Sequence, residues 1–105
     1  MTRVAVDPGI CGMHATIDVT DVGNQKVSVK ITSDCEMVTK MGESLVEVDK
    51  WDVFKPPADS EVYKCASECP LHAACPVPMA ILKAIEIEAG LAAPKAVHIR
   101  YEPTE

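Results

Sequence analysis

The segment from Cys65 to Cys75 concentrates side chains that bind metals. Within eleven residues it holds three cysteines and one histidine, which are Cys65, Cys69, His72 and Cys75. Two more cysteines, Cys11 and Cys35, lie far upstream. Thiolates and imidazole are ligands of zinc and of iron–sulfur clusters, and a thiolate is also a nucleophile. The sequence therefore points to metal or thiol chemistry, provided that the fold brings these residues together.

The composition narrows the class of protein. The 105 residues are enough for a single domain, which we expect to span residues 1–105. The net charge of −6 and the lack of a Lys/Arg run disfavour nucleic-acid binding. We find no membrane-length apolar run and no signal peptide, so we expect a cytoplasmic protein without membrane contact. Cysteines there are usually reduced, and five is an odd number, so a closed disulfide set is disfavoured.

Two of the cysteines are expected beside helix N-termini. Cys35 falls in the first turn of a helix that the capping box Ser33-Asp34-Cys35-Glu36 predicts. Cys75 lies at or just before the last helix, with Pro76 suited to the first helical position. Free N–H groups and the helix dipole stabilise an anion at such a place, which favours the thiolate form.

The spacing of the clustered cysteines matches no standard ligand motif. C-x3-C-x5-C differs from the C-x2-C pairs of zinc ribbons and from the ferredoxin pattern. Cys65 and Cys69 are expected in a loop before the last helix, which the following prolines stiffen. Free cysteine often only packs in a core, so inert packing stays open for each of the five. His72 is a candidate ligand, whereas His14 and His98 are expected to be solvated.

Hydrophobic periodicity predicts the elements that position these residues. In chain order we expect a strand at 4–6, a hairpin of strands at 15–20 and 26–32, a helix from 36 to about 45, a break at Lys55-Pro56-Pro57, a short helix near 60–65, a helix at 79–89 stopped by Gly90, and a final strand at 96–101. This order predicts an α+β fold, a small and mostly antiparallel sheet with helices packed on one face. The last strand is expected to pair with residues 4–6 or with the hairpin.

The order of three cysteine-bearing features resembles the IscU/NifU-type iron–sulfur cluster scaffolds. Cys11 lies in a glycine-containing loop before the hairpin, Cys35 follows the hairpin, and Cys75 ends Leu71-His72-Ala73-Ala74-Cys75 before an Ile/Ala/Lys-rich helix. The resemblance, over roughly residues 10–90, implies an IscU-like (SufE/IscU-like) fold in which the three cysteines converge at one end of the sheet. It also implies that they hold a [2Fe–2S] cluster or zinc and receive sulfur from a cysteine desulfurase. The last element is also similar to that of TSCPD-type domains.

Some features of that family are missing here. The family has an Asp shortly after its first cysteine, which helps cluster release, but this chain has Met13 and His14 there. Of the family's chaperone-recognition motif, L-P-P-V-K, only Pro56-Pro57 remains. The additional Cys65 and Cys69 favour a tightly held site with four or five thiolates.

The favoured hypothesis is a non-enzymatic, cysteine-rich domain for iron–sulfur cluster assembly or carriage. Its expected metal ligands are Cys11, Cys35 and Cys75, completed by Cys65, Cys69 or His72. Its expected partners are a cysteine desulfurase or iron–sulfur acceptor proteins. The alternatives are a structural zinc module on the same residues, a thiol sulfur-relay or redox protein with Cys35 or Cys75 as nucleophile, and a metal-free adaptor subunit.

Overall fold

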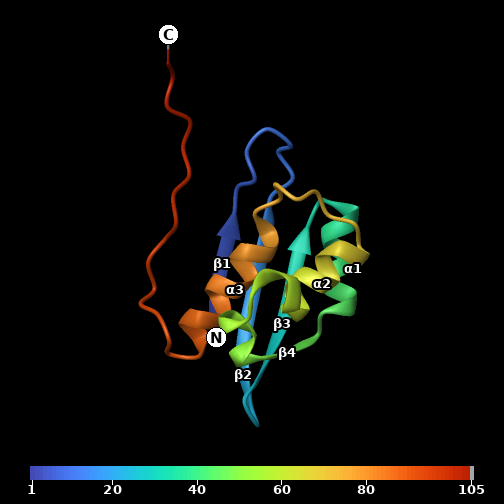
Figure 1. Cartoon of the computed structure of the whole chain (residues 1–105), viewed down its shortest axis with the longest axis vertical. Helices are drawn as coiled ribbons and strands as arrows, with labels where there is room; N and C mark the ends of the chain where they lie inside the picture. Colours follow the sequence, from blue (N-terminus) through green and yellow to red (C-terminus); the bar gives the residue numbers. More distant parts are fainter. Residues whose placement is uncertain (105) are drawn as a thin grey trace.

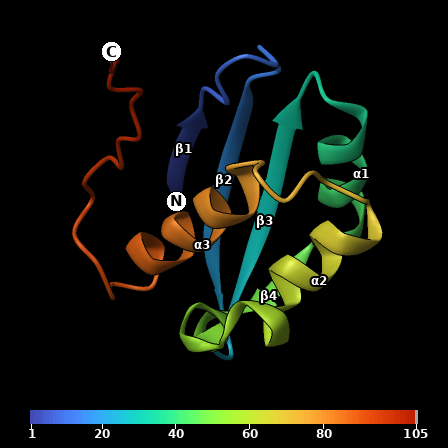
Figure 2. The ribbon, with the colours of Figure 1, turned by 45° about the horizontal axis from the view of Figure 1, so that its top comes forward.

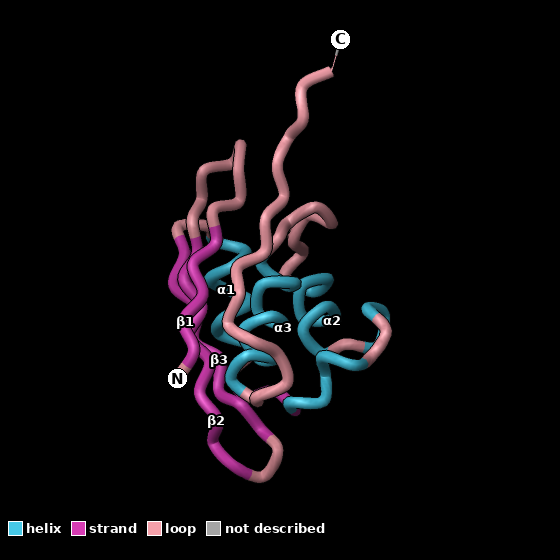
Figure 3. Tube along the Cα trace, turned by 90° about the vertical axis from the view of Figure 1, so that its left-hand side faces the viewer, coloured by secondary structure: helices cyan, strands magenta, loops and turns pink. Residues whose placement is uncertain are grey.

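Three helices cover one face of a four-stranded antiparallel sheet. The computed structural model describes residues 1–104. The sheet has the order β1-β2-β3-β4, with strands β1 (Thr2–Val6), β2 (Ala15–Gly23), β3 (Lys26–Ser33) and β4 (Glu47–Asp49). The helices α1 (Glu36–Ser44), α2 (Glu61–Glu68) and α3 (Val77–Glu88) lie together on one side of it (Figure 1, Figure 3). The predicted α+β class is confirmed.

The central hairpin follows from strict alternation and a tight turn. Ile17 of β2 lies opposite Ile31 of β3, and both side chains point toward the helices together with their alternate neighbours. Asn24 and Gln25 both have positive φ, at 55° and 62°. This is the backbone of a type I′ turn, whose twist matches that of the flanking strands. The predicted core face is confirmed: Ala15, Ile17, Val19, Val27 and Val29 are buried and Ile31 is partly buried.

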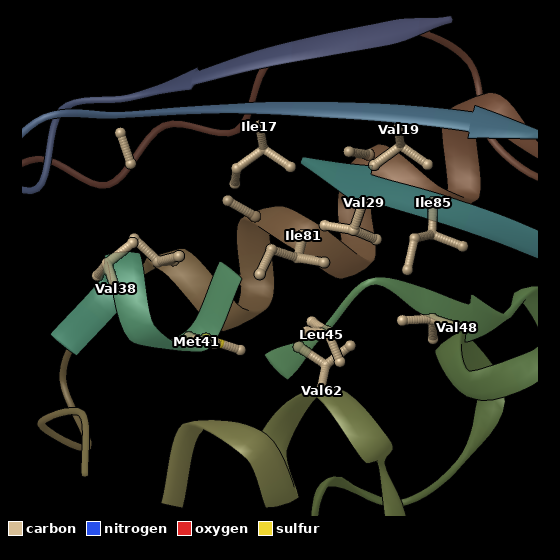
Figure 4. Close-up of a cluster of buried hydrophobic side chains, with 14 of the residues drawn as sticks. Ile17, Val19, Val29, Val38, Met41, Leu45, Val48, Val62, Ile81 and Ile85 are labelled. Atoms are coloured by element: carbon tan, nitrogen blue, oxygen red, sulfur yellow. The ribbon is translucent and has the colours of Figure 1, made fainter. Parts of the chain in front are cut away.

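The core forms between this sheet face and the helices. Ile81 and Ile85 of α3 are fully buried and lie close to Ile17 and Val19 of β2 (Figure 4). On the other side of the core lie Val38 and Met41 of α1, Leu45 just after α1, Val48 of β4 and Val62 of α2 (Figure 4). Burial of each large aliphatic side chain stabilises the fold by about 1.5–3 kcal/mol, so these contacts hold the helices on the sheet.

One buried carboxylate joins the segment after β4 to α2. Two short 3-10 helices, η1 (Lys50–Phe54) and η2 (Pro57–Asp59), connect these elements. Asp52 is 1% exposed and accepts hydrogen bonds from Ser60 Oγ at 2.6 Å and from the Glu61 amide at 2.9 Å. The Lys55 ammonium lies 3.4 Å from the same carboxylate. Burial raises the pKa of Asp52, but these donors and the Val62 amide lower it by more, so the net shift is downward.

Two helix boundaries differ from the sequence-based expectation. The first helix is capped by Cys35 and not by Ser33, so Cys35 precedes the first helical turn. Ser33 Oγ instead accepts a hydrogen bond from the Cys35 amide at 3.1 Å, which supports the turn before the helix. The second helix begins where expected, because the Ser60 hydroxyl caps it by accepting from the Tyr63 amide, but it continues to Glu68 instead of ending near Cys65. The predicted loop position of Cys65 is therefore wrong, because Cys65 lies within α2 and Cys69 is its C-cap.

The predicted final strand at 96–101 is also wrong. Residues 95–104, called the tail below, belong to no strand and no helix. The sequence alternation is present, but a strand also needs a partner, and the sheet of the described residues contains only four strands. The expected helix at 79–89 is confirmed, beginning two residues earlier, and Gly90 with φ of 75° ends it.

Within the part of the chain that the structure describes, no helix is long and apolar enough to cross a membrane.

Substitution of Asp52 by Asn should destabilise the fold. A hydrogen bond to a charged group contributes about 1.5–3 kcal/mol, so we expect Asp52→Asn to lower the free energy of unfolding by about 2–3 kcal/mol at pH 7. Because the folded pKa lies below the ordinary value of 3.8, this contribution exists above that pH and disappears as the pH falls through the folded pKa. Urea unfolding at pH 7 and pH 3, followed by circular dichroism, measures both effects.

The matched control is Asp59→Asn, since Asp59 lies in the same connection but is exposed. It should change stability by less than about 0.5 kcal/mol. An equal loss in both variants would contradict the structural role of Asp52.

Candidate thiol site

Three cysteine-bearing segments lie toward the same end of the sheet. They are the β1–β2 loop (7–14), the β3–α1 junction (34–35) and the α2–α3 connection (70–76), all near the end where β1 and β3 terminate (Figure 1, Figure 3). The antiparallel order explains this placement, because the end of β1, the start of β2 and the end of β3 must share one end of the sheet. These segments carry Cys11, Cys35 and Cys75.

Cys11 lies in a solvent-exposed loop that glycines shape. The Gly12 amide donates to the Gly9 carbonyl at 3.0 Å, and both glycines have positive φ. The Asp7 carboxylate accepts from the Gly9 amide at 3.1 Å and lies 3.6 Å from His14 Nε2. Side chains other than glycine rarely adopt this backbone, so the loop geometry depends on these glycines. The thiol of Cys11 is exposed to solvent at the tip.

Cys35 and Cys75 lie within one residue of the same position at the start of α1 and α3, respectively. Cys35 is the N-cap of α1, and its carbonyl accepts from the Thr39 amide and from Thr39 Oγ1, both at 2.9 Å. Cys75 immediately precedes the N-cap of α3, and its amide donates to the His72 carbonyl at 3.0 Å. Both cysteines are partly buried against the edge of the core. His72 is exposed in the α2–α3 connection.

Cys65 and Cys69 are the two thiols that the structure brings together. They stand four residues apart on one face of α2, and this face packs against α1. Cys65 Sγ lies 3.8 Å from the Met41 carbonyl oxygen of α1. Cys69 is 9% exposed and lines a small hollow with Lys40 and Glu43 of α1. We call these two residues the thiol pair.

The Cys65 thiol is held in its protonated form. Burial, then the charge and the hydrogen bond of Cys69, and finally the charge of Glu68 raise the pKa of Cys65 to about 11. At pH 7 only about one molecule in ten thousand therefore carries the Cys65 thiolate. A thiol of this kind reacts slowly as a nucleophile, whereas a metal ion that displaces its proton still binds it.

The predicted six-residue ligand set is only partly assembled. Among residues 1–104, no three His, Cys, Asp or Glu side chains lie close enough together to hold a metal ion as they stand. The five cysteines are free thiols. The ligand set of Cys11, Cys35, Cys65, Cys69, Cys75 and His72 therefore remains a prediction.

Sequence reasoning missed the helical position of the thiol pair. The C-x3-C spacing is itself the spacing of neighbours on one helix face, and Ser60 provides a cap at the right distance. It also missed Asp52, because a carboxylate among other charged residues gives no indication of burial. Only the tertiary contacts with Ser60 and α2 distinguish Asp52 from the exposed acidic residues nearby.

The fold and the thiols together define a small α+β domain with a helical thiol pair. The chain belongs to a family of unknown function, DUF6951, whose model matches residues 2–101. No curated protein and no solved structure matches the chain. The family match includes most of the tail, so that segment belongs to what the family shares.

Thiol alkylation should follow the structural differences between the cysteines. In the reduced, metal-free protein we expect iodoacetamide to modify Cys11 first and Cys65 last, because Cys65 combines partial burial with a pKa of about 11. Cys69→Ala removes two of the causes of that pKa and should accelerate Cys65 modification roughly threefold to tenfold. Peptide mass spectrometry over a time course measures both rates.

Cys75→Ala is the matched control, because Cys75 is not among the causes of the Cys65 pKa and should leave the Cys65 rate unchanged. Modification of Cys65 as fast as Cys11 in the native protein would contradict a protonated Cys65 that packs beside Cys69.

Proposed function

We propose that this domain binds a soft metal centre, an iron–sulfur cluster or a zinc ion, with Cys65 and Cys69 as its first two ligands. The observation that carries the proposal is the contact between these two thiols on the face of α2 that packs on α1. Two cysteines four residues apart on one helix present two sulfurs on the same side. Thiolate donors select iron–sulfur clusters, zinc and copper(I) over hard cations such as magnesium.

The remaining ligands come from the segments at the same end of the sheet. Cys35 and Cys75 each lie at the start of a helix and are partly buried at the edge of the core. Cys11 and His72 are exposed and lie in loops, so they are available to complete the set. Convergence of three cysteine-bearing segments at one end of the sheet is also what the resemblance to IscU/NifU-type scaffolds implies.

That resemblance supports a role in cluster assembly or carriage more than a catalytic one. On this proposal the protein is not an enzyme, and its partners are a cysteine desulfurase or iron–sulfur acceptor proteins. The thiol pair has no counterpart among the three cysteines carried over from that family. It therefore predicts firmer retention of the metal centre than the resemblance alone implies.

A thiol-exchange role is the second candidate, and the same contact favours it. Cys65 and Cys69 would lose two protons and two electrons to form a disulfide, while an acceptor disulfide is reduced to two thiols. Attack requires a thiolate, however, and the pKa of about 11 makes the Cys65 thiolate scarce at neutral pH. A metal supplies its own driving force for deprotonation, so the metal-binding role is the better supported of the two.

Metal content after oxygen-free purification tests the proposal. We expect brown protein with iron and sulfide, or colourless protein with stoichiometric zinc, and Cys65→Ala and Cys69→Ala should each lower the content at least threefold. Ser67→Ala is the matched control, because Ser67 is exposed on the same helix between the two cysteines. Folded protein that binds neither metal, or that keeps its metal in both cysteine variants, would overturn the proposal.

The protonated state of Cys65 makes metal affinity depend on pH. Binding must release the Cys65 proton throughout the range below a pKa of about 11, so zinc affinity should rise at least about tenfold per pH unit. Competition with a chromophoric chelator between pH 6.5 and pH 8.5 measures this slope. An affinity that stays constant with pH would show that Cys65 is not a ligand.

A redox titration separates the second candidate from the first. If the metal-binding role is correct, the metal-free protein should stay reduced in a glutathione buffer that oxidises exchange-active dithiols. Mass spectrometry then shows no loss of two hydrogens across Cys65 and Cys69. Rapid and reversible disulfide formation between them, without metal binding, would favour thiol exchange instead.

A further inference from the structure

The strand β1 forms an open edge of the sheet. It pairs with β2 from Thr2 to Val6, and no other strand of the described residues lies on its outer side. An edge strand presents unpaired N–H and C=O groups, which recruit another strand unless something covers them. The opposite edge is the three-residue strand β4, which is too short to offer much pairing.

The tail carries a strand pattern without a strand partner. Val97, Ile99 and Tyr101 alternate with Ala96, His98 and Arg100, as in a half-buried strand. In the structure these three apolar side chains are 50%, 83% and 82% exposed, respectively. A strand that packed these side chains against apolar surface would remove them from water, which stabilises the packed state.

A groove separates β1 from the tail of its own chain. The groove has a volume of about 740 Å³ and is lined by β1, by one side of α3 and by residues 94–99. Its apolar lining comprises Val4, Val6, Met79, Ile87, Val97 and Ile99. The tail runs beside β1 and α3 in the same direction as β1, and extends past the end of the sheet (Figure 1, Figure 2).

The start of the tail is held away from β1 by contacts at the end of α3. The amides of Leu91 and Ala92 both donate to the Glu86 carbonyl, at 2.8 and 3.2 Å. The Glu88 carboxylate accepts from Thr2 Oγ1 at 2.7 Å and from the Asp21 amide at 2.9 Å, which ties the end of α3 to the sheet. The chain therefore leaves α3 at a fixed place, with the groove between its tail and its own β1 edge.

The exposed area is larger than a folded monomer of this mass requires. The chain exposes 6976 Å². A folded monomer of 11.3 kDa exposes about 5,700 Å², so the excess is roughly 1,200 Å². A standard interface buries about 800 Å² of each partner, so the excess is of the size that one such interface would remove.

A second copy satisfies both unpaired features of the fold at once. Each copy offers one open β1 edge and one segment with an unpaired strand pattern, and its own tail lies on the far side of the groove from β1. Charge does not select the occupant, because the charged lining of the groove is mainly cationic, from Arg3, Lys83 and Lys95, and Arg100 is paired with Glu102 at 3.0 Å. The choice of a second copy therefore rests on the pairing of strand with edge and on the excess exposed area.

We propose that the protein forms a two-fold homodimer in which residues 95–101 of each copy pair with β1 of the other. Residues 95–101 of one copy lie in the groove of the other copy, between that copy's β1 and that copy's own tail. The two-fold axis makes the exchange reciprocal. Because each tail runs in the direction of its own β1, two tails related by a two-fold axis perpendicular to the sheet run antiparallel. The incoming strand is therefore antiparallel to β1, and Val97, Ile99 and Tyr101 cover the apolar side of α3.

Ile99→Asp tests the interface with little risk to the fold, because Ile99 is 83% exposed in the single chain. We expect the full chain to be dimeric at about 50 µM by sedimentation equilibrium, because a standard-size interface gives micromolar or tighter binding. Ile99→Asp should weaken the dimer at least tenfold and leave the circular dichroism spectrum unchanged. The matched control is Ile10→Asp, because Ile10 is also fully exposed but lies in the β1–β2 loop.

Isotope-filtered NOEs in a mixture of labelled and unlabelled chains identify the strand partner. We expect contacts between tail amides of one copy and β1 of the other. A monomer at 50 µM, an equal effect of Ile10→Asp, or NOEs between tail and β1 only within one chain would each overturn the proposal. None of these variants changes a cysteine, so failure here is separate from failure of the metal-binding proposal.

Discussion

The carboxylate of Asp52 fixes the helix that carries the thiol pair. Desolvation of a buried carboxylate costs several kcal/mol unless hydrogen-bond donors surround it. The surrounding segment is therefore restricted to the conformation that supplies those donors. Here the donors are Ser60 Oγ, the first amides of α2 and the Lys55 ammonium. Helix α2 therefore begins at a fixed point. Cys65 and Cys69 follow on the face that meets α1, where Cys69 is buried and Cys65 is partly buried.

The two faces of the sheet differ in polarity, and its two edges differ in length and pairing. One face is apolar and covered by helices, and the other carries Thr16, Asp18 and Lys30 into solvent, as alternation requires. At the β4 edge the pairing stops after three residues, and the chain continues as a 3-10 helix. At the β1 edge, Arg3 forms an ion pair with Asp18 of β2 at 2.7 Å. Its charge is therefore neutralised and does not discourage pairing with another strand, as an unpaired lysine does. The two edges therefore differ in their capacity to accept another strand.

The sequence was sufficient wherever a local pattern and its partner lie close together in the chain. The hairpin and the last helix were predicted because strict alternation or helical spacing coincides with a turn or a glycine stop. The tail has equally strict alternation, yet it forms no strand, because pairing depends on a distant edge. The thiol pair was placed in a loop because the helix expected from about residue 60 was ended near Cys65, whereas it continues to Glu68. The first error follows from a missing long-range partner, and the second concerns where a local helix ends.

The thiol pair and the open edge lie on different sides of the fold. Helices α1 and α2 lie toward β3, whereas α3 lies over β1 and β2 (Figure 2). A strand that adds to β1 therefore extends the sheet away from Cys65 and Cys69 and leaves the α1–α2 side uncovered. The groove is also lined by Gly9 and Pro76, which lie within two residues of Cys11 and Cys75 in the chain. The architecture thus separates the thiol pair from the open edge, whereas the loops that carry Cys11 and Cys75 adjoin it.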